Sequence, residues 1–139
     1  MTEIPPTRTG GCLCGKVRYT LSADPQMCVA CHCKNCQRQA GSSLSIIIGV
    51  AEGAVEITGE VKTYNDTGDS GATVRRQFCD TCGSPVFTRL EIPGLMFIKA
   101  GTLDDTSELQ PALHCYTKSK QDWVDLGDIP AFETVPEGL

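Results

Sequence analysis

The sequence lacks the features that would suit it to a membrane or to nucleic acid. It contains no run of about 18 apolar residues, so it encodes no membrane-spanning helix. It also has no excess of basic side chains, since 17 acidic residues against 12 basic ones give a formal net charge of −5. Because binding to a phosphate backbone draws on clustered Lys and Arg, we expect neither a membrane nor a nucleic acid as the partner.

Two further absences bear on the fold and on the location of the chain. No segment shows a long apolar period of 3.6 residues and no internal repeat is present, so the 139 residues are expected to form one mostly β domain spanning 1–139. Residues 1–6 lack a basic region followed by an apolar one, so no secretory signal is predicted. We therefore expect a cytoplasmic protein, whose thiols stay reduced and free to bind metal.

Cysteine, by contrast, is abundant. The chain has 9 cysteines, at positions 12, 14, 28, 31, 33, 36, 79, 82 and 115. An odd number suits a disulfide framework poorly, and the groups CxC, CxCxxC and CxxC are typical of metal ligands. Thiolate is a soft ligand that favours zinc, Cu(I) or iron–sulfur clusters. The pattern therefore favours metal binding over disulfides.

The two separated cysteine pairs can each supply half of a tetrahedral zinc site. Neither Cys12/Cys14 nor Cys79/Cys82 has a further ligand close by in the sequence, so we expect the pairs to meet in one closed, structural site. Bringing them together closes a loop of roughly seventy residues, an entropic cost that metal binding can offset. A second site with a fourth position open to water or substrate is then left to the trio Cys31, Cys33 and Cys36.

Spacing alone leaves a rival pairing open. Cys28, Cys31, Cys33 and Cys36 together could form a local four-cysteine site with no open position. Otherwise Cys28 and Cys115 are interpreted as small buried hydrophobes, which is the usual fate of a free cysteine. We do not expect His32 to bind the same metal, because the side chains of neighbouring residues diverge.

Alternating or β-branched apolar segments predict the strands. They cover residues 16–21, 44–50, 55–57, 61–64, 73–78, 86–90 and 95–100. Segments 55–57 and 61–64 flank Gly59 and Glu60, which predicts a hairpin. Residues 65–71 are predicted to be a loop. Residues 34–40 predict one or two helical turns that end at Gly41. In the more irregular last third, Trp123 is expected in the core.

These motifs, taken in order, resemble the family of glutathione-dependent formaldehyde-activating enzymes, whose zinc domain also occurs in centromere protein V. The resemblance runs from about residue 10 to about residue 132. It rests on Cys12-x-Cys14-Gly15, Cys31-His32-Cys33-x-x-Cys36, Arg76-x-Phe78-Cys79-x-x-Cys82-Gly83, the run from Ala100 to Asp105, Pro111-x-x-His114 and Lys120-x-x-Trp123.

The resemblance implies a β-tent fold, in which several small antiparallel sheets are organised around a structural zinc. It implies two zinc ions per chain, one structural and one catalytic. The structural ion would be held by Cys12, Cys14, Cys79 and Cys82, and the catalytic one by Cys31, Cys33 and Cys36. The implied activity is that of a carbon–sulfur lyase, which joins glutathione or a similar thiol to formaldehyde or another small aldehyde and gives S-(hydroxymethyl)glutathione.

Several charged side chains are candidates to assist such a site. Lys34 and Arg38 are candidates to contact glutathione carboxylates, although plain solvated charge is the simpler interpretation. His114 is a candidate to deliver a proton, although a structural histidine is the simpler interpretation. Arg75 and Arg76 lie next to each other on a predicted strand and point to opposite faces, so at most one can face the site.

Two other functions remain open at this point. A metal-stabilised binding module would need only the four-thiolate site. A thiol redox sensor would use Cys28 and the trio as metal-protected thiols that oxidise to a disulfide and release the metal.

Overall fold

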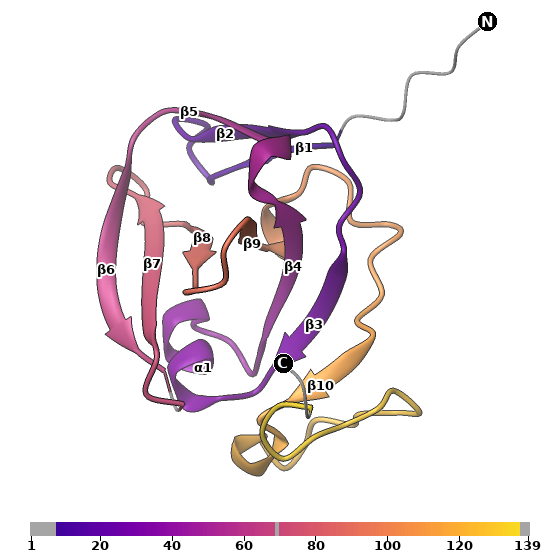
Figure 1. Ribbon diagram of the computed structural model, residues 1–139. Helices are drawn as coiled ribbons and strands as arrows, with labels where there is room; N and C mark the ends of the chain where they lie inside the picture. The colour runs from indigo at the N-terminus through magenta and orange to yellow at the C-terminus, as the bar shows by residue number, and fades with distance from the viewer. Residues whose placement is uncertain (1–7, 69, 137–139) are drawn as a thin grey trace, which may run out of the picture.

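The computed structural model describes residues 8–68 and 70–136 and is mostly β, as predicted. A three-stranded sheet has the order β1–β2–β5, and a seven-stranded sheet has the order β10–β3–β4–β9–β8–β7–β6 (Figure 1). The strands are β1 (Arg8–Gly11), β2 (Arg18–Leu21), β3 (Met27–Cys31), β4 (Ser45–Ala51), β5 (Val55–Thr58), β6 (Val61–Thr67), β7 (Thr73–Cys79), β8 (Pro85–Arg89), β9 (Leu95–Lys99) and β10 (Leu113–Cys115). The helices are α1 (Lys34–Ala40) and three 3₁₀ turns, at Glu52–Ala54, Ala100–Thr102 and Thr117–Ser119.

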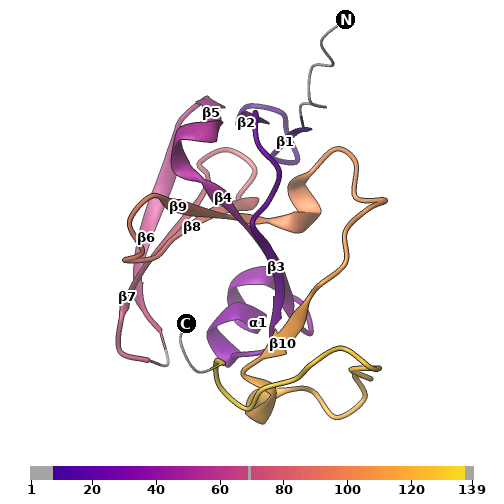
Figure 2. The same ribbon diagram turned by 45° about the vertical axis from the view of Figure 1, so that its right-hand side comes forward.

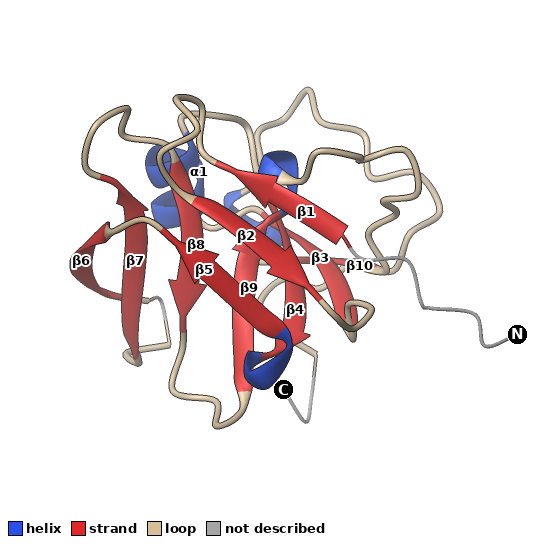
Figure 3. Ribbon diagram, turned by 90° about the horizontal axis from the view of Figure 1, so that it is seen from above, coloured by secondary structure: helices blue, strands red, loops and turns tan. Residues whose placement is uncertain are grey.

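The seven-stranded sheet curves around α1 (Figures 1, 2 and 3). The three-stranded sheet lies across one end of this large sheet (Figures 1 and 3). Its neighbouring strands are antiparallel except for β10, which runs parallel to β3. In the part of the chain that the structure describes, no helix is long and apolar enough to cross a membrane. Residues 1–6, on which the prediction of no secretory signal rests, fall outside the described part.

The main core lies between the two sheets. Tyr19 of β2 and Phe87 of β8 are almost fully buried and pack edge to face with ring centroids 5.6 Å apart. Burial of a side chain of this size stabilises the fold by about 1.5–3 kcal/mol. The Tyr19 hydroxyl also lies 2.8 Å from Thr102 Oγ1, and burial raises the pKa of Tyr19 to about 12. These contacts fasten the small sheet to the large one.

The predicted hairpin around Gly59 is wrong. β5 pairs with β2 in the small sheet, whereas β6 pairs with β7 in the large one. The chain passes between the two sheets at Gly59, which has a φ of 90°, and a Cβ there would lie 2.2 Å from the carbonyl oxygen of Lys16. The alternating pattern identified two strands correctly, but alternation carries no information about which strand each one pairs with.

The other predicted strands are all present, with small shifts at their ends, and the short helix is also as predicted. β1, β3 and β10 were not predicted. The predicted loop at 65–71 is wrong in its first part, because β6 continues to Thr67 through its pairing with β7. The prediction that Trp123 lies in the core is also wrong, since its side chain is 74% exposed.

Replacing Gly59 with Ala should destabilise the protein by about 1–3 kcal/mol or more, because the new Cβ would meet backbone in a left-handed conformation. Urea denaturation of the metal-loaded protein measures the change. Gly53→Ala is the matched control, since a Cβ at Gly53 meets nothing within 4 Å, and it should change stability by no more than about 0.5 kcal/mol. Equal effects of the two substitutions would contradict the role given to Gly59.

Candidate functional site

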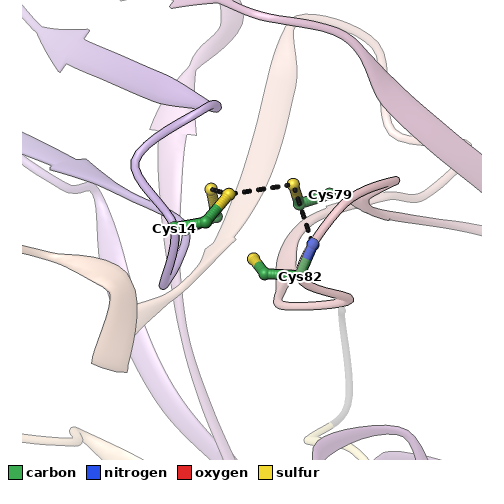
Figure 4. Close-up of side chains that lie close together, drawn as sticks. Cys14, Cys79 and Cys82 are labelled. Atoms are coloured by element: carbon green, nitrogen blue, oxygen red, sulfur yellow. Dashed lines mark hydrogen bonds between the residues drawn. The ribbon is translucent and has the colours of Figure 1, made fainter.

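One group of four thiols forms where two turns meet. Cys12 and Cys14 lie in the turn after β1, and Cys79 and Cys82 lie at and just beyond the end of β7. All four sulfurs are within 4.8 Å of one another, and Cys14 Sγ is 3.6 Å from Cys12 Sγ and 3.7 Å from Cys79 Sγ. Figure 4 shows the two segments presenting these thiols to each other. The structure thus brings together the four cysteines that spacing predicted, Cys12, Cys14, Cys79 and Cys82, which we call the quartet.

Hydrogen-bond donors surround the sulfurs of the quartet. The Val17 N–H donates to Cys12 Sγ at 3.2 Å, and the Thr81 N–H donates to Cys79 Sγ at 3.4 Å. Hydrogen bonding to Ser84 lowers the pKa of Cys82 to about 5. At Cys14 a backbone hydrogen bond from Lys16 acts in the same direction, but burial and the neighbouring thiols outweigh it and raise the pKa to about 11. Some of these thiols ionise readily, but all four together need a cation.

The trio is built by the end of β3 and the first turn of α1. Cys31 ends β3, Cys33 caps the helix, and Cys36 lies in its first turn, with the three sulfurs within 4.8 Å of one another. Cys33 Sγ accepts a hydrogen bond from the Cys36 N–H at 3.2 Å. Gly41 ends the helix in the left-handed conformation, with a φ of 63°. The short helix and its N-cap therefore position two of the three thiols, those of Cys33 and Cys36.

Cys28 does not join the trio in the structure. It pairs with Ile48 across β3 and β4, packs against the main core and lines a separate cavity of about 520 Å³. Because side chains alternate along a strand, Cys28 and Cys31 point to opposite faces of the sheet. The rival four-cysteine site that spacing had left open is not formed.

Cys115 lies beside the trio instead, which sequence reasoning missed. It is paired in register with Cys31 between the parallel strands β10 and β3 and packs with the three thiols. Contact with Cys115, and then with Cys33, raises the pKa of Cys31. Nothing in the cysteine spacing could have indicated this, because it depends on the unpredicted pairing of β10.

His32 and His114 form a buried pair next to the trio. His32 Nε2 lies 2.8 Å from His114 Nδ1, and the two residues are 0% and 6% exposed. The side chain of Gln37, on α1, donates to the His32 carbonyl at 2.8 Å and to the Ser119 carbonyl at 2.9 Å. These contacts favour a structural role for His114, which holds the C-terminal segment against the loop that carries the trio.

The charged candidates divide into exposed and buried ones. Lys34 and Arg38 are exposed on α1. Of the neighbouring arginines on β7, Arg75 is exposed and Arg76 is buried, as their alternation predicted. Arg76 Nε donates to Asp66 Oδ2 at 2.8 Å, so a guanidinium group lies under the surface on the side of the sheet that faces α1.

Comparison with known proteins gives a consistent result. A family model described as "Glutathione-dependent formaldehyde-activating enzyme" matches residues 7–119. Two curated fungal proteins that carry the same description as a provisional name are similar: one from Penicillium rubens is 29% identical over 78% of this chain and 58% of its own length, and one from Talaromyces marneffei is 28% identical over 86% and 68%. The chain thus spans well under two thirds of the Penicillium protein.

A solved structure supports the fold alone. The crystal structure of a Rhodobacter sphaeroides protein superposes with a TM-score of 0.55 at 20% sequence identity, covering 88% of this chain and 98% of that one.

Replacing Gln37 with Leu should destabilise the protein by about 1–3 kcal/mol, because it leaves the buried carbonyl of His32 and the half-buried carbonyl of Ser119 without this donor. Gln39→Leu, in the same helix, is the matched control, since Gln39 Oε1 is buried with no hydrogen-bond partner in the described part of the chain and little is lost with it. Urea denaturation of the two metal-loaded variants measures the difference. If Gln39→Leu is as harmful as Gln37→Leu, the hydrogen bonds of Gln37 are not what holds this region together.

Proposed function

Since this chain belongs to the family of glutathione-dependent formaldehyde-activating enzymes, we propose that it joins a small thiol to a small aldehyde at the trio of Cys31, Cys33 and Cys36. Glutathione and formaldehyde are the reference substrates, and the activity is that of a carbon–sulfur lyase. The observation that carries the proposal is the convergence of three thiols on one point with no fourth described ligand in their group.

The residues of the trio fit a zinc ion. They offer soft sulfur donors. Contact with Cys115 and then with Cys33 raises the pKa of Cys31, and contact with Cys31 raises that of Cys36, so a cation is needed before all three can ionise. A zinc ion held by the three sulfurs would offer a fourth coordination position in which a substrate thiol is kept as thiolate. Cys36 remains partly exposed, which favours access to that position from solvent.

The reaction needs no further side chain to react. The substrate sulfur forms a bond to the aldehyde carbon, the carbonyl π electrons move to oxygen, and that oxygen takes up a proton. His114 is buried and engaged by His32, so we propose water rather than His114 as the proton donor. The protein contributes by holding the two reactants together, which is worth several kcal/mol in favourable cases. Lys34 and Arg38, one helical turn apart on α1, would meet the carboxylates of glutathione.

We propose a structural role for the quartet. A zinc ion bound by Cys12, Cys14, Cys79 and Cys82 would have a full set of four ligands and no position for substrate. It would connect the turn after β1 to the turn after β7, and thus the small sheet to the large one.

One observation favours a second candidate function, a thiol redox sensor. Cys115 lies against Cys31, so the loss of metal from the trio would leave two adjacent thiols. A peroxide could then oxidise them to a disulfide, with two electrons passing to the peroxide and its oxygens leaving as water. The partner of Cys31 in this version is Cys115 rather than Cys28.

Replacing Cys33 with Ser should remove one metal ion per chain and abolish formation of S-(hydroxymethyl)glutathione, while the chain stays folded through the quartet. Metal content by mass spectrometry, circular dichroism and product formation are measured on reduced protein. Cys28→Ser is the matched control, since Cys28 lies on the other face of the sheet, and it should keep both metal ions and the activity.

Three outcomes would count against the enzyme. Unchanged metal content in Cys33→Ser, or full activity without the metal, would sink the proposed role of the trio. A metal-loaded wild type that binds no thiol, but forms a Cys31–Cys115 disulfide with peroxide, would favour the redox sensor instead.

A further inference from the structure

Two buried positive charges lie on the same face of the large sheet as the trio. Cys31 pairs with Ser45, and Ile47, two residues further along β4, pairs with Lys99 on β9. Two residues before Lys99, Phe97 pairs with Thr88, and Thr88 pairs with Arg76 on β7. Because side chains alternate along each strand, the side chains of Cys31, Ser45, Lys99, Thr88 and Arg76 share one face, which is the face covered by α1.

Lys99 forms no ion pair with a carboxylate of residues 8–68 or 70–136. Its side chain is buried, with the residue 7% exposed, and its ammonium group donates to the neutral hydroxyl of Ser45 at 2.7 Å. Among the described residues, no carboxylate lies within 4.0 Å of it. A buried ammonium group without a counter-charge is costly, so a nearby anion would stabilise the charged form of Lys99.

The thiols of the trio, when ionised, would supply that anion. Burial lowers the pKa of Lys99, and the charge of Arg76 adds to this effect, while Cys36, Cys31 and Cys33 oppose it. Burial also acts to lower the pKa of Arg76, but Asp66 and then Cys36 outweigh it and raise that pKa. Both cations therefore interact electrostatically with the sulfurs of the trio. Asp66 offsets the charge of Arg76 but not that of Lys99.

One hydroxyl on this face is also unsatisfied. Thr88 is 6% exposed, and its Oγ1 has no hydrogen-bond partner among the described residues. It lies between Arg76 and the β9 strand in the sheet. A buried hydroxyl without a partner costs stability unless something bound nearby satisfies it.

The net charge of a metal ion bound by the trio gives Lys99 and Arg76 a role. Three thiolates around a divalent cation carry one net negative charge, and a fourth thiolate would add another. A site removed from water resists that second negative charge unless cations lie beside it. Lys99, with Arg76 beside it, lowers this cost, because without Lys99 a fourth thiolate would bring the site to two net negative charges with no unpaired cation among the described residues of this face.

We propose that Lys99, supported by Arg76, makes the trio selective for an anionic fourth ligand, and thus for a thiol substrate bound as thiolate over a neutral ligand. This inference rests on the proposed function and deepens it, because it assigns a charge class to the group that occupies the open position. Lys99 acts here as a positioning residue through the sulfur site, not as a group that reacts.

The test uses the full chain loaded with Co²⁺, whose absorption spectrum reports the ligands around it. Wild type, Lys99→Met, Lys99→Arg and the exposed-lysine control Lys62→Met are titrated with glutathione and, separately, with imidazole. Lys99→Met should weaken glutathione binding tenfold or more, on the order of one buried charge, and should leave imidazole binding unchanged or stronger. Lys99→Arg should restore the preference, and Lys62→Met should behave as wild type.

The outcomes separate this inference from the proposed function. If Lys99→Met binds both ligands as wild type does, the role of Lys99 is overturned while the thiol site stands. If glutathione does not alter the spectrum of the wild type, the proposed function itself fails and this inference with it. Should Lys99→Met not fold, Lys99→Gln is measured in its place, and an unchanged preference in that variant overturns the proposal equally.

Discussion

The meeting of Cys12 and Cys14 with Cys79 and Cys82 is the constraint on which the rest of the structure depends. It links the turn after β1 to the turn after β7, and so ties the three-stranded sheet to the seven-stranded one. Four sulfurs within 4.8 Å of one another cannot all carry charge without a cation, because like charges repel at that range. A soft metal ion bound there, as proposed, would couple its binding to the closure of the two sheets.

The two faces of the large sheet have separate tasks. One face packs against the small sheet, and Ile48, Ile98 and Phe87 place the main core there. The other face carries the trio, the covering helix α1 and the buried cations. This division explains why Cys28 and Cys31 have different surroundings: an odd separation within a strand puts them on opposite faces, one in the core and one at the site.

Much of this could be predicted from the sequence, because most strands and both thiol groups are encoded by local spacing. The hairpin at Gly59 could not be judged, since strand partners are chosen by packing over long distances. Had residues 27–31 been recognised as a strand, alternation would have removed Cys28 from the trio. Cys115 and Lys99 gave no signal, because their roles arise only when β10 and β9 pair with strands far away in the chain.

The surroundings of the two thiol groups differ more than their sulfur counts do. Near the quartet, backbone N–H groups donate directly to sulfur. The ammonium group of Lys16, which interacts electrostatically with Cys79, is partly exposed and bonded to Asp80. The neutral backbone donors act at short range on the sulfur that they touch. Beside the trio, Lys99 and Arg76 lie out of contact with water, where the charge of a side chain acts over a longer range. In the proposed site such charges would influence a fourth ligand as well as the three sulfurs, an effect that requires an open coordination position.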